Sequence, residues 1–191
     1  MGVDNAIAFC AGWTRRSVLL APGAALLTAC GVGPAPPAPK PTPLPQGDGL
    51  LGRYYASRDW SGPVVVERVD PVIEFDWSGA HPVAAQVFSV RWEGFLVIPP
   101  REGGPYTLSL RSDDASWLYL DGALLVDNGG IHTAVLRSGL ADLTSGPHQL
   151  RIDYVELEPR LSLISFQWRK PNGDRSTVPR SVLHSRSPVV D

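Results

Sequence analysis

Cysteine and an excess of either charge are scarce in this chain. Its 191 residues include two cysteines, Cys10 and Cys30, too few for a framework of several disulfides or a zinc site built on four thiolates. The 17 basic and 19 acidic residues leave a formal net charge of −2. Because a dedicated nucleic-acid binder usually carries a strongly basic surface, this balance excludes that class of protein.

Long apolar runs and recognisable catalytic motifs are also missing. The apolar stretch at residues 17–29 is shorter than the roughly 20 residues that a membrane-spanning helix needs. No longer window keeps an apolar stripe at the 3.6-residue period of a helix. The chain has no Walker loop, dinucleotide fingerprint or G-x-S-x-G motif, and its histidines lack the spacing of a metal-binding pair. The sequence therefore points to no enzyme class.

The N-terminus, in contrast, carries the features of an export signal. Arg15 and Arg16 precede the apolar stretch, which ends in Leu-Thr-Ala-Cys at Cys30. This ending resembles the bacterial lipobox, which implies cleavage before Cys30 and lipid attachment to it. The arginine pair also resembles a twin-arginine signal, and an ordinary signal peptide with a chance cysteine is the alternative. We expect residues 1–29 to be a lipoprotein signal peptide.

Glycine and proline are abundant, at 19 residues each, and many of the prolines gather in one segment. Residues 34–45 are dense in proline, which favours an extended polyproline II chain of about 3.1 Å per residue. Such a run can also be a ligand for a partner domain, but a spacer suits its place beside a lipidated cysteine. We expect residues 30–48 to tether an exported domain to a bacterial membrane, at the cell surface or the periplasmic face.

The rest of the chain alternates apolar and polar residues in short segments. The clearest are residues 88–92, 106–111, 150–154 and 164–168. This pattern indicates β-strands with one face in a core and one in water. Asp121-Gly122 separates two apolar segments and is typical of a type I′ hairpin turn. We therefore predict an all-β domain, an antiparallel β-sandwich over residues 49–184, with a C-terminal tail at 185–191.

Aromatic, glycine and acidic landmarks follow one another along this domain in a recognisable order. They are Gly49, Tyr54, Tyr55, residues 88–94, 106–108, 112–114 and 118–122, His148, Tyr154, Glu156, Trp168, Val178 and Pro179. Together they resemble the PA-fourteen domain family, named after the fourteen-kilodalton piece of anthrax protective antigen. The resemblance implies a jelly-roll-type β-sandwich that often binds carbohydrate. It also implies calcium held beside an Asp-Asp pair that a cis peptide joins.

Asp113-Asp114 is the pair that matches this implication. Two adjacent carboxylates repel each other unless a cation neutralises them, and calcium prefers six to eight oxygen ligands. Two solvated turn aspartates are the alternative. The family often carries a third ligand just past a neighbouring strand, where Glu156 lies, with Glu158 as second choice; either can also be a solvated strand-end carboxylate. We expect calcium at Asp113, Asp114 and Glu156.

Six tryptophans invite a search for sugar-stacking positions. Trp92 and Trp168 share a face with apolar strand residues, so we expect them in the core. Trp117 lies on the opposite face of its strand, and Trp60 and Trp77 lie in irregular polar segments. An exposed aromatic ring with nearby polar groups suits a ligand site. The candidate glycan contacts are Trp60, Trp77, Trp117 and Asn128.

The chain departs from the family pattern at two places near these residues. Ala115 replaces the glycine that commonly follows the two aspartates, which bears on the backbone shape there. Asn128 is followed by two glycines and not by an aromatic residue, which bears on sugar stacking at that loop.

From these features we predict a lectin-like, non-catalytic, calcium-dependent carbohydrate-binding module, displayed for adhesion through a lipid on Cys30. Its partners would be glycans or cell-surface polysaccharide and, through the anchor, the membrane. Two alternatives stay open. One is a structural or protein-interaction sandwich without a sugar site, and the other is an accessory domain of a glycoside-processing system.

Overall fold

The computed structural model describes residues 47–158, 161–171 and 173–188, all within one compact unit, Thr42–Asp191. The predicted signal peptide, Cys30 and nearly all of the predicted tether lie outside the described residues. Within the described part of the chain, no helix combines the length and apolar character needed to cross a membrane.

The described residues form strands and one short 3-10 helix. These are β1 (Leu50–Tyr55), β2 (Val66–Asp70), β3 (Glu74–Asp76), β4 (Phe88–Ile98), β5 (Gly104–Asp113), β6 (Ala115–Leu120), β7 (Ala123–Asn128), β8 (Val135–Leu143), β9 (Gly146–Glu156), β10 (Leu163–Arg169), β11 (Arg175–Thr177), η1 (Arg180–Val182) and β12 (Leu183–His184).

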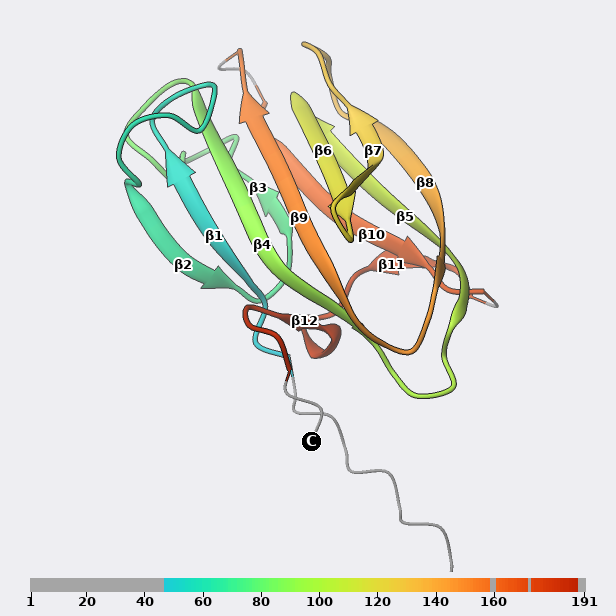
Figure 1. The fold of residues 1–191 in the computed structure, drawn as a ribbon. Coiled ribbons are helices and arrows are strands. Elements are labelled where there is room, and N and C mark those ends of the chain that lie inside the picture. Colours follow the sequence, from blue (N-terminus) through green and yellow to red (C-terminus); the bar gives the residue numbers. More distant parts are fainter. Residues whose placement is uncertain (1–46, 159–160, 172, 189–191) are drawn as a thin grey trace, which may run out of the picture. The chain divides into compact units, whose positions relative to one another are not determined.

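Two antiparallel sheets pack face to face (Figure 1). The seven-stranded sheet has the order β2-β1-β4-β9-β6-β7, with β12 beside β4. The five-stranded sheet has the order β11-β10-β5-β8, with β3 beside β10. The predicted all-β sandwich is therefore confirmed.

The segments that alternate apolar and polar residues are strands of this sandwich, as predicted. The four segments with the clearest alternation lie in β4, β5, β9 and β10. Trp92 and Trp168 are buried between the sheets, as predicted. Asp121 and Gly122 join β6 to β7 with φ angles of 49° and 81°, the two positive values that a type I′ turn needs.

Trp77 is a correction to the sequence analysis, because it belongs to the core and cannot contact a glycan. Its side chain is 6% exposed, and its ring stacks on Phe75 at 4.9 Å and lies parallel to Trp92 at 6.4 Å. The backbone N–H of Trp77 donates to the carbonyl of Ser162, which fixes it directly after the short strand β3. The polar residues around Trp77 in the sequence concealed this edge strand.

Candidate functional site

Asp113 and Asp114 lie where the chain crosses from one sheet to the other. Asp113 is the last residue of β5 in the five-stranded sheet, and Ala115 is the first residue of β6 in the seven-stranded sheet. The peptide between the two aspartates is cis. Their side chains are 6% and 2% exposed, so the alternative of two solvated turn aspartates is excluded.

The Asp114 carboxylate holds two neighbouring loops to this crossing. Its Oδ1 accepts a hydrogen bond from the backbone N–H of His132 at 3.1 Å. Its Oδ2 accepts hydrogen bonds from the backbone N–H groups of Leu157 and Glu158, both at 3.0 Å. Because each carboxylate oxygen has two lone pairs, Oδ2 is fully used and Oδ1 keeps one lone pair. Asp114 therefore orders the loops on both sides of the site.

The Asp113 carboxylate is in an electrostatically unfavourable place. Burial raises the pKa of Asp113, and the charges of Asp114 and Glu158 raise it further. The charge of His132 and the backbone N–H of Ala134 act in the opposite direction. The net result is a raised pKa, which means that the folded chain disfavours a negative charge here. A bound cation would reverse that preference.

Glu156 lies behind the pair, inside the molecule. Its side chain is fully buried, so the alternative of a solvated strand-end carboxylate is excluded. The Tyr154 hydroxyl lies 2.9 Å from Oε2 of Glu156 and donates at 2.5 Å to the backbone carbonyl of Asp113. Glu156 is thus joined to the aspartate pair through Tyr154.

Burial is also the main cause of a raised pKa at Glu156, to which the charges of Asp113 and Asp114 add. The hydroxyls of Ser162 and Tyr154 oppose this rise. Nevertheless, Oε1 of Glu156 is buried without a well-aligned hydrogen bond, and the Ser162 hydroxyl likewise has none. Oε1 of Glu156 can therefore accept a further hydrogen bond.

The donor atoms at this crossing suit part of a calcium shell. They are the two carboxylate oxygens of Asp113 and the remaining lone pair on Oδ1 of Asp114, all of which are hard oxygen donors. Within the described residues, no three or more His, Cys, Asp or Glu side chains are placed to hold a metal ion, so the predicted set of Asp113, Asp114 and Glu156 does not converge on one ion. A calcium ion at the aspartate pair would take its other ligands from carbonyl oxygens or water.

Asn128 is turned into the molecule and is not the exposed glycan contact that the sequence analysis proposed. Its side chain is 2% exposed, and its amide donates to the Ser112 hydroxyl at 2.9 Å and the Val135 carbonyl at 3.3 Å. Its own backbone carbonyl lies 3.0 Å from Nε2 of His132. Asn128 therefore anchors the loop at residues 129–134, because it bonds to His132 within the loop and to Val135 directly after it.

Trp60 and Trp117, far apart in the sequence, lie together on the outer face of the seven-stranded sheet. Their ring centroids are 6.1 Å apart in an edge-to-face arrangement, and both side chains are half-buried. The Trp60 indole N–H donates to the carbonyl of Val90, and the Arg91 guanidinium lies 5.1 Å from the Trp60 ring. A Cβ on Gly129 would lie 3.0 Å from the Trp117 ring, so this aromatic pair reaches the 129–134 loop.

His132 is the residue of this site that the sequence analysis missed. It bonds to Asp114 through its backbone and to Asn128 through its ring, and its charge acts on Asp113. Its spacing from the other histidines does not match a metal-binding pair, so spacing gives no sign of it. The one usable signal was that His132 follows Asn128 in a glycine-rich loop.

The family model of the PA14 domain matches residues 46–181. The chain belongs to the PA14 domain family. A relative in Acetivibrio thermocellus, the anti-sigma-I factor RsgI3, is 32% identical over 142 residues, which cover 72% of this chain and 21% of that protein.

Solved structures of other proteins share this fold. An anti-sigma factor domain-containing protein from Clostridium clariflavum is 25% identical, with a TM-score of 0.64, and the match covers 75% of this chain and 48% of that one. A PA14 sugar-binding domain from an RTX adhesin is 19% identical, with a TM-score of 0.58, and the match covers 73% of this chain and 98% of that one. The chain thus spans about half, or less, of the two anti-sigma relatives.

Proposed function

We propose that this protein is a non-catalytic, calcium-dependent glycan-binding domain displayed on the outside of a bacterial membrane. The observation that carries the proposal is the pair of adjacent, buried carboxylates of Asp113 and Asp114, gathered with two loops at one end of the sandwich. The likeness in fold to a PA14 sugar-binding domain supports it.

In this proposal the aspartates and the tryptophans of the site would have different roles. Asp113 and Asp114 would hold the ion, and Asp114 also keeps both loops in place. A bound calcium ion supplies a centre to which two hydroxyls of a sugar can bind in place of water. The half-buried Trp60 and Trp117 would offer apolar surface to the C–H groups of the same sugar. Affinity for a single sugar should be modest, because such a site buries little surface.

Display outside the membrane depends on residues that precede the sandwich. Residues 1–29 would direct export, a lipid on Cys30 would anchor the chain, and residues 31–48 would hold the domain away from the bilayer. Anchored copies would bind a repetitive glycan jointly, which raises their apparent affinity without any new contact.

A melting experiment on the full-length chain tests the metal site first. Calcium should raise the melting temperature of the parent chain, because an ion that binds only the folded state stabilises it. Asp113→Asn should remove the response. Asp142→Asn, an exposed aspartate on β8, is the matched control and should keep it. An equal response in all three chains, or none in the parent, would contradict the proposal.

A glycan array in calcium and in EGTA tests the sugar. We expect at least one glycan whose binding is lost both in EGTA and in Asp113→Asn. If no glycan on the array depends on calcium and on Asp113, the calcium bridge is wrong. A normal calcium response without binding to any glycan would favour the structural or protein-interaction alternative.

A further inference from the structure

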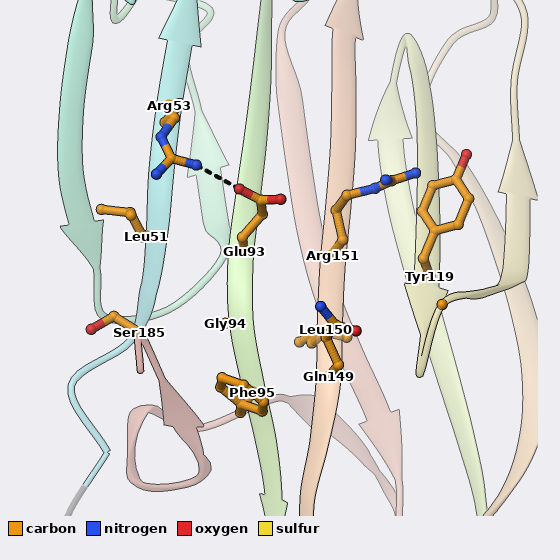
Figure 2. Close-up of a pocket in the computed structure, with 11 residues that line it drawn as sticks. Leu51, Arg53, Glu93, Gly94, Phe95, Tyr119, Gln149, Leu150, Arg151 and Ser185 are labelled. Carbon is orange, nitrogen blue, oxygen red and sulfur yellow. Dashed lines mark hydrogen bonds and ion pairs between the residues drawn. The ribbon is translucent and has the colours of Figure 1, made fainter. Parts of the chain in front are cut away.

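A hollow lies on the outer face of the seven-stranded sheet, away from the aspartate pair. It encloses about 380 Å³ over β1, β4, β9 and β6. The side chains that matter for its chemistry are Arg53, Glu93, Phe95, Tyr119, Gln149 and Arg151 (Figure 2). Gly122 of the β6–β7 hairpin also lines it, whereas Asp113 and Asp114 precede the opposite end of β6.

The charged groups of this hollow are held in place before any ligand arrives. The Arg53 guanidinium bonds to Glu67 at 2.8 Å and to Glu93 at 2.5 Å. The Arg151 guanidinium lies 3.8 Å from the centre of the Tyr119 ring, and Figure 2 shows it reaching across to that ring. Groups that are already fixed lose little conformational entropy when they bind a ligand, which favours recognition.

The hollow presents polar groups that a ligand can reach. The Arg151 side chain is 37% exposed, although its Nε is buried 3.5 Å from Asp153. The Gln149 side chain is exposed, and its amide makes no hydrogen bond within the described part of the chain. Exposed donors in a hollow suit a ligand with hydroxyl or carbonyl oxygens.

The balance of charge around the hollow favours an uncharged ligand. Three guanidinium groups are paired with three carboxylates across this face: Arg53, Arg91 and Arg151 with Glu67, Glu93 and Asp153. Each guanidinium that lines the hollow is therefore already paired with a carboxylate. Phe95 and Tyr119 add half-buried rings to these polar groups. Paired donors and acceptors beside apolar surface match a polyol, whose hydroxyls donate and accept and whose C–H groups are apolar.

A peptide strand is a poorer match for this face. β1, β4, β9 and β6 each have a paired strand on both sides, so no free backbone edge is available for an added strand. Tyr119 and Trp117 lie on the same face of β6, about 7 Å apart at the usual rise of a strand. A linear ligand that runs along β6 would therefore meet the hollow first and the Trp60–Trp117 pair next.

We propose that this hollow is a second glycan site, which binds a neutral oligosaccharide without calcium. Arg151 and Gln149 donate to its hydroxyls, Glu93 accepts from them, and Tyr119 supports both Arg151 and the sugar. The site does not depend on the aspartate pair, so it can be tested independently of the calcium-dependent function proposed above.

NMR titration of the full-length chain in EGTA tests this site, with cello-, xylo- and manno-hexaose as the probes. At least one probe should shift the Gln149 side-chain amide resonances at about 10 mM, above a weak Kd of about 1 mM. Tyr119→Ala should weaken that binding by about tenfold or more, a loss expected of a central aromatic contact. Tyr119→Phe should keep most of it, because the ring remains. Leu140→Ala, an exposed residue of β8 in the other sheet, is the control and should change nothing.

The outcomes separate the two glycan sites. Binding in EGTA that survives Asp113→Asn and is lost in Tyr119→Ala supports the second site even if the calcium site binds no sugar. No shift with any probe, or equal weakening by Tyr119→Ala and Leu140→Ala, overturns it. Binding that appears only with calcium and is lost in Asp113→Asn also overturns it and leaves the aspartate site in place.

Discussion

At the residue scale, Asp113 and Asp114 are neighbours with different surroundings. Asp114 accepts three backbone hydrogen bonds, which satisfy most of its carboxylate. Asp113 is buried beside it with a raised pKa. An acid whose pKa is higher in the folded chain than in the unfolded chain destabilises the fold once it is ionised. Ionised Asp113 therefore works against the stability of the folded chain.

Asp113→Asn should consequently stabilise the calcium-free chain at neutral pH. In the parent, protonated Asp113 contributes to the stability of the fold. That stability is lost as the pH rises from the pKa of the unfolded chain, about 4, through the raised pKa of the folded chain. The variant lacks that loss, so its melting temperature in EGTA should exceed that of the parent at pH 7 and converge with it at about pH 3. Melting curves across this range measure the difference. Parallel curves that never converge would contradict the assignment to Asp113.

Tyr154→Phe tests the link between the pair and Glu156. The Asp113 carbonyl and the buried Oε2 of Glu156 then lose their hydrogen bonds from this hydroxyl, which should lower the free energy of unfolding by about 1–3 kcal/mol. The response to calcium should weaken as well. Tyr106→Phe is the matched control, because its hydroxyl bonds to the Glu102 carbonyl away from the site. Urea titrations with and without calcium should show a loss of stability in both variants and a weaker calcium response only in Tyr154→Phe.

At the scale of elements, the contact between β7 and β8, one edge strand from each sheet, depends on Gly139. β7 is the edge of the seven-stranded sheet and β8 is the edge of the five-stranded sheet. A Cβ at Gly139 of β8 would lie 2.5 Å from the Leu125 carbonyl of β7 and 2.7 Å from the Leu125 Cγ. Glycine is therefore needed for these two edges to come together.

Gly139→Ala should separate the β7 and β8 edges and lower the free energy of unfolding by about 1–3 kcal/mol, the usual cost of overpacking. Gly79→Ala is the control, because nothing lies within 4 Å of its Cβ position. Urea titrations of both variants measure the effect. An equal effect on the two variants would show that loss of backbone freedom, and not the contact with Leu125, is responsible.

Local patterns predicted the elements but not the contacts between distant segments. Alternation located β4 and β9 because each strand has one face in the core, and Asp121-Gly122 located the hairpin because its turn needs two positive φ angles. Trp77 and Asn128 were misplaced because their burial depends on partners elsewhere in the chain, at Ser162 and Ser112. The aspartate pair was found through the family resemblance, with which its chemistry agrees. The direction in which Asn128 points depends on contacts outside its own segment, so no local pattern predicts it.

At the scale of the whole molecule, the two glycan sites and the anchor would act together. The proposed calcium site lies where β6 begins, and the proposed second site lies near the hairpin where β6 ends. A chain held at a membrane presents both sites in many copies, and linked weak sites bind a polymer far more tightly than any one of them. Attachment through Cys30 is therefore the feature on which useful affinity would depend.

Cys30→Ser tests this dependence in a bacterial host. Without the lipid, the exported chain should move from the membrane fraction to the soluble fraction, because the acyl chains supply the membrane affinity. Retention of cells on an immobilised glycan should fall by about 100-fold, the lower range expected when multivalency is lost. Cys10→Ser is the matched control, since Cys10 lies within the predicted signal peptide, and it should behave like the parent. Fractionation, followed by a cell-retention assay, measures both effects. If Cys30→Ser stays in the membrane fraction like the parent, the lipid anchor is wrong, whereas both glycan sites remain open to their own tests.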